Sequence, residues 1–250
     1  MYCSLFFLFN IAKFLSNKNF QFNENYLFNE ISNQQLELIS KLNLTQLPMK
    51  SEFETKISNT KNAVLQNYYF KNNHFRKVRL TYFKADDKQM FSSVWYPSYD
   101  YECPILTLDL VNFKKNVSLC FVNSVEIYNN AQYLNTYINP LIEIKKNYPE
   151  LSESKTIHLK ALNNVLSKSM LYGNIYDDDK FNTMIPEVLD KYLTFYTKNF
   201  IKKPINRYYI EEKHMFYNKL RAQLESNFIL KDYYDSEWFK RLIDEYYLFN

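Results

Sequence analysis

The sequence predicts an α+β fold, a three-layer α/β/α sandwich with a central antiparallel sheet. Between residues 75 and 123, four segments show the two-residue alternation of strands and are joined by short polar connections, as in an antiparallel meander. The flanking segments instead repeat apolar residues every three or four positions, as amphipathic helices do. Because no low-complexity linker interrupts the chain, we expect a single domain over residues 23–250, preceded by an N-terminal extension at residues 1–22.

The first predicted helix covers residues 24–46, where leucines and an isoleucine repeat on one face. Pro48 interrupts this pattern, so "NLTQLPMKSEF" is interpreted as a connection. The predicted strands follow in the order "FRKVRLTYF", "KQMFSSVWYP", "PILTLDLVNF" and "NVSLCFVN". In the first of them, apolar residues alternate with Lys77, Arg79 and Thr81.

Five further helices are predicted after the strands. They cover residues 140–148, 153–171, 185–200, 205–228 and 236–249. Pro140 suits a helix start, and Ser154 is a candidate cap for the second of these helices. In the last helix, Trp238, Leu242 and Tyr246 lie along one apolar stripe.

Composition excludes several classes of function. The 250 residues include one glycine, Gly173, so the chain has neither a P-loop nor a glycine-rich dinucleotide-binding loop. A formal net charge of +4 is small for a dedicated nucleic-acid binder. Since the three cysteines form no C-x-x-C pair and the three histidines are scattered, we expect neither a disulfide framework nor a bound metal.

The N-terminal extension begins with the apolar stretch "YCSLFFLFNIAKF". It is too short to span a bilayer, which takes about 20 apolar residues, and it lacks the basic lead-in and cleavage site of a secretory signal. It is either an organelle-targeting segment or a segment that packs on the domain. We expect no membrane association elsewhere in the chain.

Asp109 is the first candidate for chemistry, because it interrupts an apolar strand. Ile105, Thr107 and Asp109 share one face of that strand, since side chains alternate. Burying an ionised carboxylate costs several kcal/mol unless the group is paired or protonated. A site that keeps this carboxyl near neutrality would make it a proton donor. The alternative is an aspartate at a strand edge that reaches solvent or caps a backbone group.

Three other groups of polar residues have a functional and a purely structural interpretation. Ser92 and Ser93 either line a ligand site or are satisfied core hydroxyls. The predicted helix 205–228 carries one polar stripe, which faces either solvent, the usual case, or a ligand. Its members are Glu211, His214, Asn218, Arg221 and Glu225. The basic clusters at residues 76–79 and 202–207 either bind an acidic group or form solvated surface, which is the default.

The central block resembles the ferredoxin-dependent bilin reductases, and most closely their phycoerythrobilin-forming branch. The family has a basic strand "FRK-x-RLTY", a strand ending in "YPS", and then "D-x-P-[IL]-L-G-x-D-L". Here "FRKVRLTYF", "YPS" at residues 96–98 and "CPILTLDL" at residues 103–110 match these motifs. Similar segments follow in the family's order: "YINPLIEIKKNYPEL", "VLDKYLTFY" and "SEWFKRLIDEYYLF".

The resemblance implies an antiparallel sheet between two helical layers, with a bilin held between the sheet and the C-terminal helices. It also implies no bound flavin or metal: ferredoxin supplies single electrons to the tetrapyrrole, and the protein supplies protons. The family's central proton-donating aspartate falls on Asp109. A second family aspartate falls on Asn218, which cannot give up a proton, and a family arginine falls on Arg221. Ser92 replaces the family's Asn or His.

Two further residues belong to the expected site. Thr107 stands where the family has glycine, and His214 belongs to the polar stripe of the same helix as Asn218. On this resemblance Asp109 and Asn218 are the candidate catalytic residues. The candidate substrate-binding residues are Ser92, Thr107, His214 and Arg221.

The sequence leaves three functions open. The first is ferredoxin-dependent reduction of a linear tetrapyrrole, 15,16-dihydrobiliverdin to phycoerythrobilin, in phycobilin biosynthesis. The second is a catalytically weak bilin-binding or escort protein of the same fold, motivated by the loss of the second aspartate. The third, a nucleic-acid-binding module, is disfavoured by the small net charge. We expect a monomer with ferredoxin and a bilin as partners, in a plastid or in the cytoplasm of a photosynthetic cell.

Overall fold

The computed structural model describes residues 27–58, 61–113, 117–152, 165–199, 206–228, 230 and 232–247. The predicted N-terminal extension therefore lies outside the described residues. The chain divides into two compact units, Met1–Leu44 and Thr45–Asn250. The expectation of one domain over residues 23–250 stays a prediction.

In the first unit, the helix α2 runs from Asn29 to Lys41. The prediction of a helix through residue 46 was too long. Asn43 has a φ of 54°, in the left-handed region, and its N–H donates to the carbonyl of Ser40 at 3.0 Å. Asparagine is among the few residues other than glycine that adopt this conformation readily, and it ends the helix in the usual manner of a C-terminal cap.

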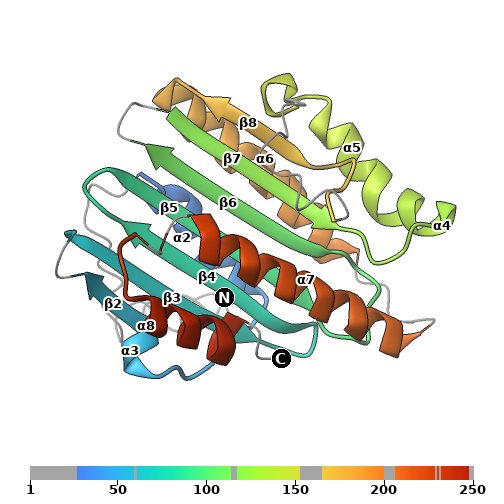
Figure 1. Ribbon diagram of the computed structural model, residues 1–250. Coiled ribbons are helices and arrows are strands. Elements are labelled where there is room, and N and C mark those ends of the chain that lie inside the picture. Colours follow the sequence, from blue (N-terminus) through green and yellow to red (C-terminus); the bar gives the residue numbers. More distant parts are fainter. Residues whose placement is uncertain are drawn as a thin grey trace, which may run out of the picture. The chain divides into compact units, whose positions relative to one another are not determined.

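The second unit contains an eight-stranded sheet (Figure 1). Its strands are β1 (Thr45–Gln46), β2 (Thr55–Ser58), β3 (Ala63–Lys71), β4 (Phe75–Lys84), β5 (Lys88–Pro97), β6 (Ile105–Phe113), β7 (Val117–Val125) and β8 (Leu171–Ile175). They lie in the order β1-β3-β4-β5-β6-β7-β8, with β2 also paired to β3, and all pairings between them are antiparallel. The four predicted strands are confirmed as β4 to β7.

The strands that the sequence pattern missed lie at the two ends of the sheet. β3 contains a buried asparagine, Asn67, in a run that is not cleanly alternating. Only the first residue of β8, Leu171, falls in a predicted helix, which covers residues 153–171, and residues 172–175 have no predicted element. Residues 153–164 lie outside the described part of the chain, but residues 165–170 form turns and Leu171 begins β8, so the predicted helix end was wrong.

The helices of this unit are α3 (Ser51–Glu54), α4 (Ala131–Tyr133), α5 (Asn139–Lys145), α6 (Asp178–Lys198), α7 (Arg207–Phe228) and α8 (Ser236–Leu242). Three short turns complete the helical structure. The π-helical turn η1 (Leu134–Ile138) joins α4 to α5, the π-helical turn η4 (Ile243–Tyr247) continues α8, and the 3-10 turn η2 (Pro149–Leu151) follows α5. The predicted helices at residues 140–148, 185–200, 205–228 and 236–249 correspond to α5, α6, α7 and α8 with η4. The helical segment before Pro140 begins earlier than predicted, at Ala131.

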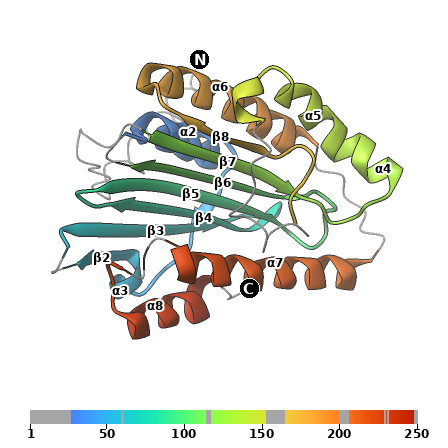
Figure 2. The ribbon, with the colours of Figure 1, turned by 45° about the horizontal axis from the view of Figure 1, so that its top comes forward.

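Within residues 45–250 the three-layer α+β sandwich is confirmed. One face of the sheet carries α6, with α5 beside it, and the other carries α7 and α8 (Figures 1 and 2). The hydroxyl of Tyr196 on α6 donates to the carbonyl of Trp95 on β5 at 3.3 Å, which ties the first layer to the sheet. The opposite layer is tied to the sheet by the polar contacts described below.

Strand register separates a largely apolar face of the sheet from a polar one. Val78 and Leu80 on β4 lie on the α6 side, whereas Lys77, Arg79 and Thr81 lie on the α7 side and are all buried. The default prediction of a solvated basic cluster was therefore wrong for Lys77 and Arg79. The helical layer that covers this face removes both side chains from water, and the Arg79 guanidinium lies 4.0 Å from the Tyr247 ring centroid.

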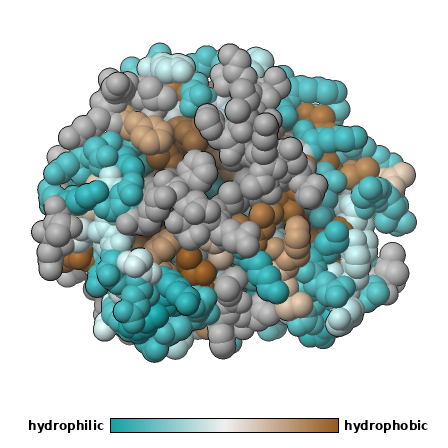
Figure 3. Space-filling model, viewed as in Figure 1, coloured by the Kyte–Doolittle hydropathy of each residue, from teal (hydrophilic) through white to brown (hydrophobic). Residues whose placement is uncertain are grey.

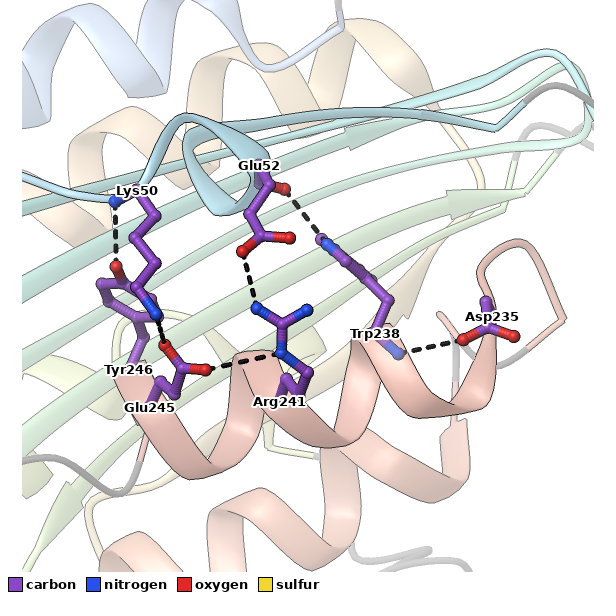
Figure 4. A network of polar contacts seen from close by, with 7 residues as sticks. All are labelled: Lys50, Glu52, Asp235, Trp238, Arg241, Glu245 and Tyr246. Carbon is purple, nitrogen blue, oxygen red and sulfur yellow. Dashed lines mark hydrogen bonds and ion pairs between the residues drawn. The ribbon is translucent and has the colours of Figure 1, made fainter.

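The closing helix α8 and the turn η4 are fastened to α3 by a network of polar contacts (Figure 4). Arg241 pairs with the Glu52 carboxylate at 2.6 Å, and Trp238 Nε1 donates to the Glu52 carbonyl at 3.1 Å. Lys50 Nζ pairs with Glu245 at 2.5 Å. The surface over α3 and α8 is correspondingly hydrophilic (Figure 3). This network holds η4 beside the strand that carries Lys77, whose ammonium donates to the Tyr246 carbonyl.

The one glycine of the chain has a steric role. Gly173 on β8 pairs with Cys120 on β7, and a Cβ on residue 173 would run into the carbonyl oxygen of Glu150 in η2. Since backbone cannot yield as a flexible side chain does, we expect Gly173→Ala to lower the free energy of unfolding by about 1–3 kcal/mol. Urea denaturation measures this, with Asn174→Ala on the same strand as the control. Equal stability of Gly173→Ala and wild type would contradict the steric role.

Candidate active site

The centre of the polar face holds an ion pair between the sheet and α7. Asp109 lies on β6, directly opposite Ser92 on β5. Arg221 from α7 grips the Asp109 carboxylate with two guanidinium nitrogens: one donates to Oδ2 at 2.5 Å and the other donates to Oδ1. The second nitrogen also donates to Ser92 Oγ at 3.1 Å. The geometry is a bidentate pair, the strongest form of contact between arginine and a carboxylate.

This pair explains how a charge is accommodated in the middle of the sheet. The side chains of Asp109 and Arg221 are only 19% and 10% exposed, so each would be costly without the other. The alternative of a strand-edge aspartate was wrong, because β6 is hydrogen-bonded to β5 on one side and to β7 on the other. Arg221, on which the resemblance places a family arginine, is the partner.

A row of polar residues extends from Asp109 across the neighbouring strands. Register places Asn67, Thr81, Ser92 and Asp109 side by side on β3, β4, β5 and β6. Thr81 Oγ1 donates to Asn67 Oδ1 at 2.8 Å, and Asn67 Nδ2 donates to the carbonyl of Phe53 at 2.9 Å. Asn67 is not among the site residues predicted from the sequence. The strand register places it in this row, and that register cannot be predicted from one sequence alone.

The polar stripe of α7 faces the sheet and not solvent. His214 is 0% exposed, Asn218 3% and Arg221 8%. The solvated interpretation of the stripe was therefore wrong for these three residues. Glu211 is partly exposed, and the side chain of Glu225 lies outside the described part of the chain. Three consecutive helical turns thus deliver three polar side chains to the polar face.

His214 is held by a residue that sequence analysis left in a basic cluster. Arg76 Nε donates to His214 Nδ1 at 3.3 Å, and the same guanidinium lies 4.7 Å and 4.8 Å from the ring centroids of Tyr96 and Tyr99. Burial lowers the pKa of His214 well below its usual value, and the Arg76 charge lowers it further. The imidazole is therefore neutral at neutral pH.

Two side chains on α7 have polar atoms that lack a hydrogen-bonding partner among the described residues. They are His214, at Nε2, and Asn218, at both Oδ1 and Nδ2. Leaving such groups buried and unsatisfied costs about 1–3 kcal/mol each. Unpaired polar atoms at the centre of a polar face are typical of a site that a ligand completes.

Thr107 and Tyr217 extend the site from Asp109 toward the start of β6. Thr107, two residues from Asp109 on the same face, donates to the carbonyl of Asn123 at 3.4 Å. Burial raises the pKa of Tyr217, while Arg221 and a hydrogen bond with Thr107 act in the opposite direction. Tyr217 was missed, although its place four residues before Arg221 puts it on the same side of the helix.

Apolar clusters flank this polar centre on both sides. One joins buried residues of β3 to β6 to the layer of α8, including Leu65, Phe83, Val111, Trp238 and Leu242. The other joins β5 to β7 to α7 and the turns at residues 165–170, including Val94, Ile105, Phe121, Val165 and Tyr217. A polar centre between apolar flanks suits a flat, largely apolar ligand with a few polar groups.

No group of three or more possible ligands for a metal ion occurs among the described residues. Within the same residues, no helix is both long enough and apolar enough to cross a membrane. Cys103 and Cys120 are free and buried, and burial raises the pKa of both thiols. Both thiols are therefore poorly suited to act as nucleophiles.

Residues 32–250 match the sequence model of the family described as ferredoxin-dependent bilin reductase. The chain belongs to this family. Its members are oxidoreductases that act on bilins with electrons from ferredoxin. This confirms the resemblance on which the sequence analysis drew.

Individual relatives agree with this assignment. The chain is 25% identical over 219 residues to the 15,16-dihydrobiliverdin:ferredoxin oxidoreductase of Nostoc punctiforme, covering 84% of this chain and 89% of the relative. It is 23% identical over 214 residues to the protein of the same name from Prochlorococcus marinus strain AS9601, covering 83% and 91%. The fold is similar to that of tomato phytochromobilin synthase in complex with biliverdin, with a TM-score of 0.70 at 13% identity, over 88% of this chain and 82% of that one.

The pair between Asp109 and Arg221 predicts a non-additive response to substitution. Arg221→Met should lower the free energy of unfolding by about 2–4 kcal/mol, because it leaves the carboxylate buried without a counter-charge. Combining it with Asp109→Asn should restore much of that loss. Denaturant unfolding measures both. Arg207→Met is the matched control, since Arg207 on the same helix pairs with Asp100 in an exposed position and should contribute about 1 kcal/mol or less.

His214 predicts a component of acid sensitivity. Its folded-state pKa lies below the ordinary value of 6.5, so below pH 6.5 the unfolded chain binds a proton that the folded chain does not. Stability is therefore lost as the pH falls from 6.5 toward the folded-state pKa, by up to about 1.4 kcal/mol per pH unit. Unfolding free energies measured between pH 7.5 and 5 should fall less steeply for His214→Gln. An unchanged slope would refute this, and His74→Gln controls for replacing a histidine as such.

Proposed function

We propose that this chain catalyses the ferredoxin-dependent reduction of 15,16-dihydrobiliverdin to phycoerythrobilin, a step of phycobilin biosynthesis. Two reduced ferredoxins each give one electron and two protons are taken up, so that one double bond of the bilin becomes a single bond. The proposal is supported by the names of the cyanobacterial relatives and by the site built around Asp109. The observation that carries it is an acid, Asp109, whose side chain is only 19% exposed at the centre of a polar face with apolar flanks.

The bilin would lie against the polar face of the sheet, beneath α7. Its conjugated rings suit the apolar flanks, and its pyrrole and lactam nitrogens suit the polar centre. Asp109 is the proposed proton donor, and Asn218 is a hydrogen-bonding partner, since an amide cannot give up a proton under these conditions. Ser92, Thr107, His214 and Arg221 are the proposed substrate contacts.

The bidentate contact with Arg221 holds the carboxylate in place for this chemistry. Each carboxylate oxygen of Asp109 accepts one hydrogen bond from the guanidinium and keeps a second lone pair that can accept from a substrate. A pyrrole N–H can donate to one of these lone pairs while Arg221 stays bound to Asp109 and to Ser92. Asp109 can then take up a proton from water and pass it to the reduced bilin.

The partners and the site of action follow from this proposal. Ferredoxin is the electron donor that the family requires, and no bound flavin or metal is needed for turnover. We propose a plastid, or the cytoplasm of a photosynthetic cell, as the compartment, because ferredoxin and phycobilin synthesis occur together there. The monomeric state stays a prediction.

The decisive experiment is an anaerobic turnover assay with 15,16-dihydrobiliverdin and, separately, biliverdin. Purified protein, ferredoxin and a reducing system should shift the absorption spectrum of the bilin to that of phycoerythrobilin. Asp109→Asn should bind the pigment but slow product formation by about 100-fold or more, because the positioned proton donor is lost. Arg207→Met serves as the matched control.

The same assay separates the second candidate function. Asn218, which stands at the family's second aspartate and cannot give up a proton, favours a bilin escort that binds pigment without reducing it. A coloured complex that shows no spectral change under reducing conditions would establish the escort and refute the reductase. Recovery of turnover in Asn218→Asp would then attribute the loss of activity to that position.

A further inference from the structure

His214 is locked in one tautomer by its neighbour. Because Arg76 Nε donates to Nδ1, that nitrogen carries the lone pair, and the proton of the neutral ring must reside on Nε2. Burial and the Arg76 charge both oppose protonation of the ring. The side chain thus presents one N–H donor and no acceptor beyond Nδ1, and Nε2 has no partner among the described residues.

Asn218 lies one helical turn further along the same side of α7. Its carboxamide offers an acceptor and two donors, and neither Oδ1 nor Nδ2 is bonded within the described part of the chain. Both residues are at least 97% buried, so water does not readily satisfy these groups. Together they present three N–H donors, Nε2–H of His214 and the two Nδ2–H groups of Asn218, and one acceptor, Oδ1 of Asn218.

We propose that His214 and Asn218 form a recognition point for a lactam ring, with Arg76 as the positioning residue that sets the tautomer of His214. A lactam has an N–H beside a C=O, which pairs edge to edge with a carboxamide: Asn218 Oδ1 accepts from the N–H and Nδ2 donates to the C=O. The second lone pair of the lactam oxygen accepts from His214 Nε2–H. A carboxylate would fit worse, because it has no hydrogen for Oδ1.

This inference rests on the proposed function, because linear tetrapyrroles have a lactam at each end. It assigns to residue 218 a role that needs no proton transfer. It also assigns one end of the pigment to the His214 end of α7, seven residues before Arg221 and hence about 10 Å along the helix. The site would therefore fix which end of an elongated ligand lies near Asp109.

The test uses the wild-type chain and biliverdin in the dark without ferredoxin, so that binding is seen apart from turnover. Infrared difference spectra should show one lactam C=O stretch lowered by hydrogen bonding. His214→Phe and Asn218→Leu should each raise this frequency and raise the dissociation constant about tenfold or more, since each loses a buried hydrogen bond. Lys219→Leu, at an exposed position on the same helix, should do neither.

Biliverdin dimethyl ester distinguishes a lactam from a carboxylate. The ester keeps both lactams and lacks both free carboxylates, so the ratio of variant to wild-type dissociation constants should be the same as for biliverdin. If that ratio fell to one for the ester, the two residues would bind a propionate and the proposal would be wrong. Circular dichroism of each variant verifies that it is folded.

Nitrogen-15 NMR of histidine-labelled protein tests the role of Arg76. The His214 signals, identified by their loss in His214→Phe, should show Nδ1 without a proton and Nε2 with one. Arg76→Leu should mix the two tautomers and weaken biliverdin binding only when His214 is present. A wild-type ring protonated on Nδ1 would overturn the proposal.

Two outcomes separate this inference from the proposed function. If the protein binds and reduces the bilin but the lactam C=O frequency is the same in wild type, His214→Phe and Asn218→Leu, this inference alone is wrong. If the wild type binds no bilin, the proposed function is wrong.

Discussion

The ion pair between Asp109 and Arg221 fixes how α7 lies on the sheet. It joins residues 112 positions apart in the chain, and its two-point geometry specifies both the rotation and the axial position of the helix. Once Arg221 is placed, helical spacing dictates that Tyr217 and Asn218 face the sheet one turn before it and His214 two turns before it. The polar face of the sheet and the polar stripe of the helix thus supply partners for each other, and burying either one alone would be costly.

The same pair governs how the site can react. A carboxylate held by two guanidinium hydrogens is fixed in position, and each of its oxygens keeps a lone pair that can accept from a ligand N–H. The apolar clusters on both sides exclude water, which strengthens every polar contact between them. The site is therefore prepared for a ligand whose polar atoms are few and concentrated, and it discriminates against small hydrated solutes.

Sequence patterns identified the centre of the fold and part of the site. Two-residue alternation located β4 to β7, and the interruption of an apolar strand singled out Asp109, because both signals are local. The partners of Asp109 and His214 were harder to find, since Arg221 and Arg76 reach them across layers of the structure. The solvated interpretation of α7 failed for a general reason: a helix that covers a polar sheet face has a polar stripe on its buried side. Strand β3 was missed because its Asn67 serves that same face, and β8 because five residues with a glycine at their centre are too few to show the alternation of a strand.

Lys77 attaches the last helical turn to the sheet through main-chain atoms. Its ammonium donates to the backbone carbonyl of Tyr246 and reaches that of Tyr247 at 3.5 Å, so the acceptors belong to the main chain. Every amino acid supplies a carbonyl, and any substitution at positions 246 or 247 leaves these acceptors in place. This contact between the last helical turn and the sheet therefore persists whatever side chains stand at positions 246 and 247, so the place of that turn can be retained while its sequence changes.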